Sequence, residues 1–95
     1  MVPVHPGRIL RDELRSRALS ANGLARALRV PSGRIVDILN GKRAISAETA
    51  LRLGRYFGND PQFWMNLQAQ YELAVAAREV GRRVAKEVDV ADAAA

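Results

Sequence analysis

The residues that could support enzyme or metal chemistry in this 95-residue chain are few, and the first of them is its single histidine, His5. The chain contains no cysteine, so neither a second imidazole nor a thiolate is present to share a metal ion with His5. Asp12, Glu13 and Glu79 could be imagined as a general acid and base, but nothing in their spacing brings them together. We therefore expect a capping or packing role for His5, no metal, no cofactor and no enzyme activity.

The cations offer a second kind of chemistry, because they are distributed unevenly along the chain. The formal net charge is +5 overall, but it is +7 through Gly58 and −2 from Asn59 onward. Positive charge confined to the first two thirds of a chain favours an anionic partner for that part. Charge alone leaves a solvated basic surface as an equal alternative.

Length and composition limit the structures that can carry this charge. A chain of 95 residues is expected to form one compact domain, and its small core makes dimerisation plausible. No apolar run approaches the roughly 20 residues that span a bilayer, and the first residues lack the features of a secretory signal. We expect a cytoplasmic protein that makes no membrane contact.

The elements that position the charged side chains are all expected to be helices, because apolar residues recur at helical spacing and strand alternation is never sustained. Ser20, Ser46 and Asp60 are the expected N-caps, and Pro31 and Pro61 suit the first turn of a helix. The expected helices cover residues 6–17, 20–28, 31–39, a stretch from 46 to about 57, and a long segment from 61 onward.

The apolar side chains that repeat within each predicted helix are expected to form the core. In the first four helices these are Ile9, Leu10, Leu14, Leu24, Ala25, Leu28, Ile35, Ile38, Leu39, Ala50, Leu51, Leu53, Gly54 and Phe57. The long helix carries Phe63, Trp64, Leu67, Tyr71, Ala74 and Val75, and its aromatic residues are expected in the core or at a subunit interface.

Residues 20–28 and 31–39 form two short predicted helices with a tight break between them. Such a pair can be part of an ordinary helical bundle, or it can be a helix-turn-helix. In a helix-turn-helix the first helix braces across the DNA backbone and the second lies in the major groove. With Ile35 and Ile38 buried, the second helix presents its opposite side outward. The residues on that side are Ser32, Gly33, Val36 and Asp37, with Arg34 at the edge.

Arg34 is the best candidate to read a base directly, because a guanidinium can pair with both O6 and N7 of guanine. The alternatives for Arg34 are a phosphate contact or a salt bridge with Asp37 one helical step away. Lys42 and Arg43 suit phosphate contacts, for which the alternative is an exposed basic loop.

The order of these segments resembles the HigA family of antitoxins, which are small Xre-type, lambda-repressor-like regulators of toxin–antitoxin operons. The matching segments are residues 5–10, 19–28, 30–35, 40–46, 49–53 and 61–68, within a similarity that covers residues 4–79. The resemblance implies an all-α, five-helix lambda-repressor-like domain at residues 1–79. Beyond the similarity we expect a helical extension with a frayed tail at residues 80–95, because the tail from Val88 has no turn, cap or large apolar residue.

The resemblance further implies an antitoxin that binds a palindromic operator as a homodimer, represses its own operon and neutralises a HigB toxin of the RelE-like ribonuclease class. Two alternatives stay open at this point. One is a phage-type or metabolic repressor without a toxin partner, and the other is a protein-interaction bundle that does not bind DNA.

The predicted site follows from the second helix and from the positions that match the family. The residues predicted to contact double-stranded DNA are Ser20, Asn22, Ser32, Gly33, Arg34, Val36, Asp37, Asn40, Lys42 and Arg43. The residues predicted to form the dimer interface are Trp64, Leu67 and Tyr71.

Two positions depart from the family pattern. Arg29 replaces a glycine that often takes a positive φ. Arginine can tolerate that conformation at some cost, and the alternative is a turn that is tightened differently. Ala21 replaces a glutamine that often contacts phosphate, so no such contact is expected there.

Overall fold

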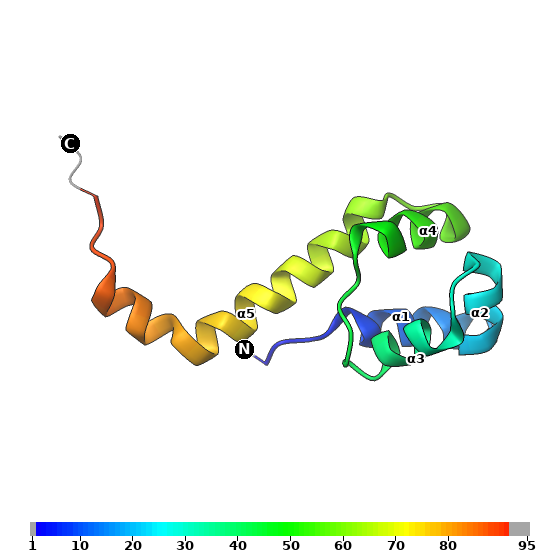
Figure 1. Cartoon of the computed structure of the whole chain (residues 1–95), viewed down its shortest axis with the longest axis horizontal. Helices are drawn as coiled ribbons and strands as arrows, with labels where there is room; N and C mark the ends of the chain where they lie inside the picture. The colour runs from blue at the N-terminus through cyan, green and yellow to red at the C-terminus, as the bar shows by residue number, and fades with distance from the viewer. Residues whose placement is uncertain (1, 92–95) are drawn as a thin grey trace.

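The computed structural model describes residues 2–91, and this part of the chain folds into five α-helices without a β-strand (Figure 1). The helices are α1 (Pro6–Ser16), α2 (Ala21–Leu28), α3 (Ser32–Leu39), α4 (Ala47–Phe57) and α5 (Pro61–Glu87). The predicted all-α, five-helix fold is confirmed. The tail predicted to be frayed begins at Val88, where α5 has ended, and its last four residues lie outside the described part.

Side-chain caps explain where most of these helices begin. The hydroxyl oxygen of Ser20 accepts a hydrogen bond from the backbone N–H of Gly23, and that of Ser46 accepts one from Thr49. A carboxylate oxygen of Asp60 accepts from the N–H of Gln62. These are the three predicted caps, and each satisfies an N–H that the first turn of a helix leaves unpaired. Pro31 occupies the N-cap of α3 and makes no side-chain cap bond.

The core lies where α1 to α4 meet the first half of α5, and its largest fully buried side chain is Trp64. Its buried hydrophobic members are Leu10, Leu14, Leu24, Ala25, Leu28, Ile35, Ile38, Ile45, Ala50, Leu53 and Trp64. Leu51 was expected in this core, but it is 61% exposed. A helix turns by about 100° per residue. Once Ala50, Leu53 and Gly54 face inward, Leu51 is rotated toward solvent.

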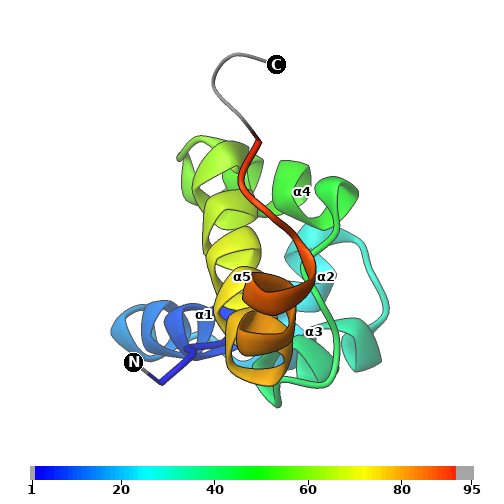
Figure 2. The same ribbon diagram turned by 90° about the vertical axis from the view of Figure 1, so that its left-hand side faces the viewer.

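The fifth helix extends well beyond this core. Figures 1 and 2 show its second half projecting away from the other four helices, and the molecule measures 54 Å along its longest axis against 24 and 22 Å across. No helix within the described residues combines the length and the apolar character needed to cross a membrane. Because α5 runs unbroken through residues 79 and 80, the domain boundary expected there stays a prediction.

The start of α1 is fixed to α3 by a close backbone approach. Gly7 lies so near the carbonyl oxygen of Ile38 that a methyl group at position 7 would overlap it. The side chain of Arg11 donates a hydrogen bond to the carbonyl oxygen of Leu39, 3.1 Å away, at the end of α3. These contacts set the position of α3 from its C-terminal end.

The turn between α2 and α3 contains a non-glycine residue in the left-handed region. Arg29 has φ 58° and ψ 48°, and its backbone N–H donates to the carbonyl oxygens of Ala25 and Arg26. Arginine therefore tolerates the positive φ expected at this position, and the alternative, a differently tightened turn, is wrong. Arg29 adopts the conformation that glycine adopts more easily, and the surrounding packing of α2 and α3 compensates for its cost.

Candidate nucleic-acid interface

Helices α2 and α3 are adjacent in space and joined by the turn at Arg29, which is the arrangement of a helix-turn-helix (Figure 1). Ile35 and Ile38 are fully buried and fasten α3 to the core. Ser32, Gly33 and Val36 are exposed on the opposite side, as the sequence predicted. An exposed helix face held by such a core can enter a major groove, which is about 12 Å wide.

A surface groove of about 370 Å³ runs along α2 to the start of α3. Asn22 and Arg26 from α2 and Ser32 from α3 line it. Ser20 is exposed just before α2, where its side chain is engaged as the cap. Gly33 has no heavy atom within 4 Å of the place where its Cβ would be, so a base edge or a sugar could approach the backbone there closely.

Arg34 is held differently from the alternative considered in the sequence analysis. Its Nη1 lies 3.3 Å from a carboxylate oxygen of Glu48 in α4, and its side chain is 27% exposed. The expected alternative partner, Asp37, instead lies 3.9 Å from Nε of Arg43. The alternative prediction of an Arg34–Asp37 salt bridge is thus wrong, because the guanidinium of Arg34 points toward the start of α4 and away from the next turn of α3.

The loop between α3 and α4 carries the predicted phosphate-binding cations. Lys42 and Arg43 are both exposed there, and Asn40 forms the C-cap of α3. The side-chain oxygen of Asn40 accepts a weak hydrogen bond of 3.4 Å from Arg11. Exposed cations beside a helix face are the groups that DNA-binding proteins use to contact phosphates.

Two contacts on the inner side of this loop, from Gln68 and His5, set its position. The side-chain oxygen of Gln68, in α5, accepts a 2.8 Å hydrogen bond from the backbone N–H of Ile45. The ring of His5 lies under Gly41, and its Nδ1 accepts a 2.9 Å hydrogen bond from the N–H of Gly7. Burial lowers the pKa of His5, and a backbone hydrogen bond with Arg43 partly opposes that shift. The capping and packing role expected for His5 is confirmed.

The residues predicted to form a dimer interface differ in their exposure. Trp64 is 1% exposed, and its indole N–H donates to the side chain of Asn59 at 3.2 Å. Its assignment to an interface is therefore corrected, because α4 and α5 already enclose its ring within one chain. Leu67 and Tyr71 are partly exposed and line an apolar groove of about 300 Å³ beside the N-terminal segment.

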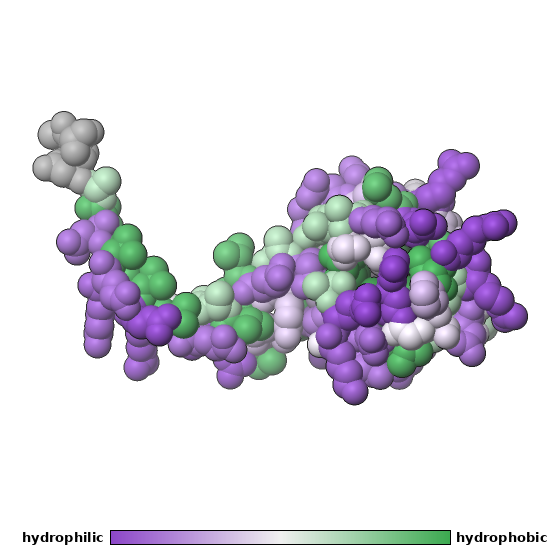
Figure 3. All heavy atoms as spheres, in the orientation of Figure 1, coloured by the Kyte–Doolittle hydropathy of each residue, from purple (hydrophilic) through white to green (hydrophobic). Residues whose placement is uncertain are grey.

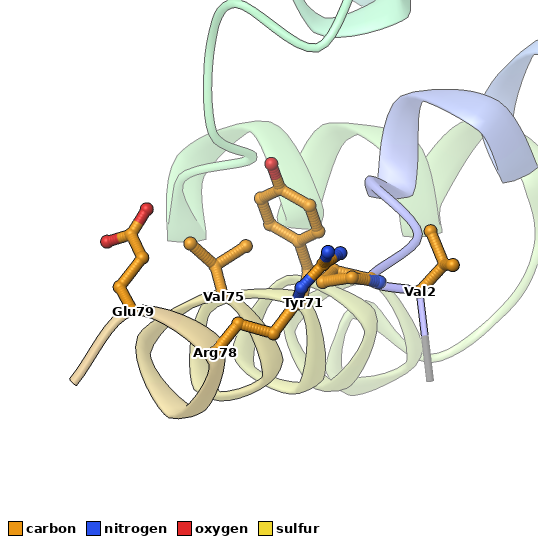
Figure 4. A pocket seen from close by; sticks show the side chains of 6 residues that line it. Val2, Tyr71, Val75, Arg78 and Glu79 are labelled. Carbon is orange, nitrogen blue, oxygen red and sulfur yellow. The ribbon is translucent and has the colours of Figure 1, made fainter. Parts of the chain in front are cut away.

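A second groove continues from the first along α5. Figure 4 shows Tyr71, Val75, Arg78 and Glu79 on α5, with Val2 across from them. Farther along, the projecting part of α5 displays apolar side chains on its surface (Figure 3). Val84 is 48% exposed there, and Leu73, on the side of α5 opposite Tyr71, is 72% exposed.

Sequence reasoning missed two charged residues near the candidate DNA face. Arg26 shares the groove of Asn22 and Ser32, and its spacing of four residues from Asn22 could have identified it. Glu48 is 14 residues from Arg34, so no local pattern could have paired the two.

Comparison with known proteins agrees with this geometry. A helix-turn-helix family model matches residues 10–64. Virulence-associated protein I from Dichelobacter nodosus is 50% identical over 80 residues, which make up 83% of this chain and 74% of that protein.

Two solved structures are similar to nearly the whole chain. An addiction module antidote protein of a HigA family from Coxiella burnetii is 47% identical with a TM-score of 0.93, covering 96% of this chain and 100% of its own. Pseudomonas aeruginosa antitoxin HigA, solved with the higBA promoter, is 48% identical with a TM-score of 0.90, covering 93% and 97%. The matching proteins are helix-turn-helix and antitoxin proteins and not enzymes, in agreement with the expectation for this chain. The chain belongs to the Xre-type helix-turn-helix family and, within it, to the HigA family of antitoxins.

Proposed function

We propose that the chain is an antitoxin that binds operator DNA in its own promoter, represses its own operon and neutralises a RelE-like ribonuclease toxin of the HigB type. The observation that carries this proposal is the exposed outer face of α3, on a fold shared with an antitoxin that was solved with its promoter. The toxin would supply the catalytic residues. This chain would supply a DNA-binding face and a surface that covers the toxin.

The charges around α3 support DNA as the ligand. Arg26, on α2, and Lys42 and Arg43, on the loop between α3 and α4, are exposed beside the outer face of α3. Phosphate contacts from such cations would position the protein, and side chains of α3 would read base edges. The proposed contacts are those of Ser20, Asn22, Ser32, Gly33, Arg34, Val36, Asp37, Asn40, Lys42 and Arg43.

Gel-shift titration tests the DNA part of the proposal. The full-length chain is titrated against the promoter fragment upstream of its own gene and against a scrambled fragment of equal length. We expect tighter binding to the promoter, with Ser32→Ala losing up to about tenfold on the promoter and much less on the scrambled DNA. Equal binding to both fragments by the unmodified chain would contradict the proposal.

The toxin part has a separate test. Co-expression with the protein encoded beside this gene should restore growth that this neighbour alone arrests, and the two proteins should co-purify. A chain that binds its promoter but has no growth-arresting neighbour would support the second candidate, a repressor without a toxin. This second candidate is supported by the similarity to virulence-associated protein I, whose name mentions no toxin.

We also propose that the chain binds DNA as a homodimer paired through α5. A palindromic operator needs two copies of α3 about 34–36 Å apart, one turn of DNA. Leu67, Tyr71 and Ala74 line an apolar groove on one side of α5, and Val75 continues this side along the helix. A second copy of α5 would cover this surface, which is more apolar than a small monomer usually leaves in water.

A further inference from the structure

A chain of three contacts links the outer edge of α3 to the body of the protein. Nη1 of Arg34 donates to Oε2 of Glu48 at 3.3 Å, and the same oxygen lies 3.4 Å from Nε of Arg52. Nη1 of Arg52 then donates to the carbonyl oxygen of Leu28, at the end of α2, over 2.9 Å. Three helices are therefore tied to one carboxylate.

A carboxylate at this place needs an explanation, because it lies beside the face where phosphates are expected. Glu48 is 63% exposed, and an unpaired acid there would repel DNA. Arg34 and Arg52 together more than cancel its charge. Glu48, in the first turn of α4, therefore costs little binding energy at this position, and the residue through which it can act on DNA is Arg34.

The geometry of arginine indicates what that effect is. A guanidinium reads guanine with two parallel hydrogen bonds, which requires a fixed plane and a fixed direction. A free arginine side chain loses rotamer entropy when it is fixed in this way. Glu48 engages Nη1 of Arg34 and leaves the other donors of the guanidinium free for a base.

We propose that Glu48 is a positioning residue that fixes the guanidinium of Arg34 for recognition of a guanine, and that Arg52 fixes Glu48 in turn. This inference rests on the proposed function, since it assigns a base to one side chain of the same DNA face. The Arg34–Glu48 pair differs from the Arg43–Asp37 pair. Arg43 lies in the loop between α3 and α4, where it suits a phosphate contact and not a base.

The test compares base preference with overall affinity. Dissociation constants are measured for the promoter operator and for every single base-pair replacement in one half-site. The base pair read by Arg34 is the one whose replacement ceases to matter in Arg34→Ala. In the unmodified protein that replacement should weaken binding by about 5- to 150-fold, the range for one bidentate pair.

Glu48→Gln should lose about tenfold of the discrimination at that base pair and leave the other base pairs unchanged. Its affinity for random DNA should stay the same or rise, because one negative charge is removed. A residue that only supported the fold would not weaken specific binding while strengthening non-specific binding. In Arg34→Ala, the change Glu48→Gln should have no further effect on base preference.

Two further variants complete the experiment. Glu87→Gln removes an acid that also pairs with an arginine, Arg83, four residues earlier on α5, and should change nothing. Glu48→Asp keeps the charge but withdraws the carboxylate by one methylene, and should lose an intermediate part of the discrimination even if Glu48→Gln folds poorly.

A uniform loss of affinity on operator and random DNA, or an unchanged base preference in both Glu48 variants, would overturn the inference alone. Failure of the unmodified chain to prefer its promoter would overturn the proposed function, and the inference with it.

Discussion

The imidazole of His5 lies edge-on against the phenol ring of Tyr71, with 4.9 Å between the ring centroids. This contact joins the residue before α1 to the middle of α5. The same imidazole caps α1 through Gly7 and supports the loop at Gly41. One titratable ring therefore holds together the start of the fold, the cation-bearing loop and the long helix.

This position makes stability depend on pH. Burial lowers the pKa of His5 from 6.5, so the unfolded chain takes up the proton before the folded chain does. The contribution of neutral His5 is fully present above the unfolded pKa of about 6.5 and is lost as the pH falls from there through the lower pKa of the folded chain. We expect the free energy of unfolding in urea to decrease from pH 7 to pH 5.5. His5→Asn retains an acceptor for Gly7 and should flatten this dependence, whereas an equal slope in both proteins would contradict it.

The close approach of Gly7 to Ile38 predicts a sensitive glycine. Gly7→Ala places a methyl group on a carbonyl oxygen of α3 and should lower the free energy of unfolding by about 1–3 kcal/mol. Gly81→Ala is the matched control, because its Cβ would meet only Ala77 Cβ at 4.0 Å within α5. That change should raise stability by about 0.5–1 kcal/mol. Urea denaturation followed by circular dichroism measures both, and a Gly7→Ala protein of unchanged stability would refute the backbone contact.

The exposed position of Lys42 predicts a contact that is independent of sequence. Lys42→Ala should weaken binding to promoter and scrambled DNA by similar factors. It should also reduce the slope of log affinity against log salt by about one, the value for one lost phosphate contact. Lys86→Ala removes the same charge from the far end of α5 and should leave the slope unchanged. A Lys42→Ala slope equal to that of the unmodified chain would remove this lysine from the set of backbone contacts.

The apolar surface of α5 predicts a dimer that single changes can disrupt. The full chain should sediment as a dimer at micromolar concentration. Truncation after Arg78 or the substitution Val75→Lys, in the groove, should shift it toward the monomer. Leu73→Lys is the control, because Leu73 is 72% exposed but lies about 200° around α5 from Val75, on the opposite side of the helix. If Leu73→Lys dissociates the dimer, or if the full chain sediments as a monomer, the proposed interface is wrong.

Local signals explain most of what could be predicted from the sequence. Ser20, Ser46 and Asp60 cap helices through backbone groups two or three residues away, so their types and positions were sufficient. The outer face of α3 followed from the burial of Ile35 and Ile38 at helical spacing.

Contacts between distant segments explain what could not be predicted. The apolar pattern of α5 indicated a buried face, but it could not distinguish coverage of Trp64 by α4 of the same chain from coverage by a partner. The pairing of Arg34 with Glu48 depends on the angle at which α3 meets α4, which is set by the whole core. Predicting the left-handed conformation of Arg29 would require knowledge of the packing on both sides of the turn, which outweighs the local cost of that conformation.

The enclosed position of Trp64 has a practical consequence. It is the only tryptophan in the chain, so nearly all of the intrinsic fluorescence excited at long ultraviolet wavelengths comes from one indole between α4 and α5. That indole lies in the interior, whereas the candidate DNA contacts are on the outer face of α3. Its emission should shift to the red when the chain unfolds and stay constant when unlabelled DNA is added. One optical signal therefore separates loss of the fold from loss of binding in every variant described above.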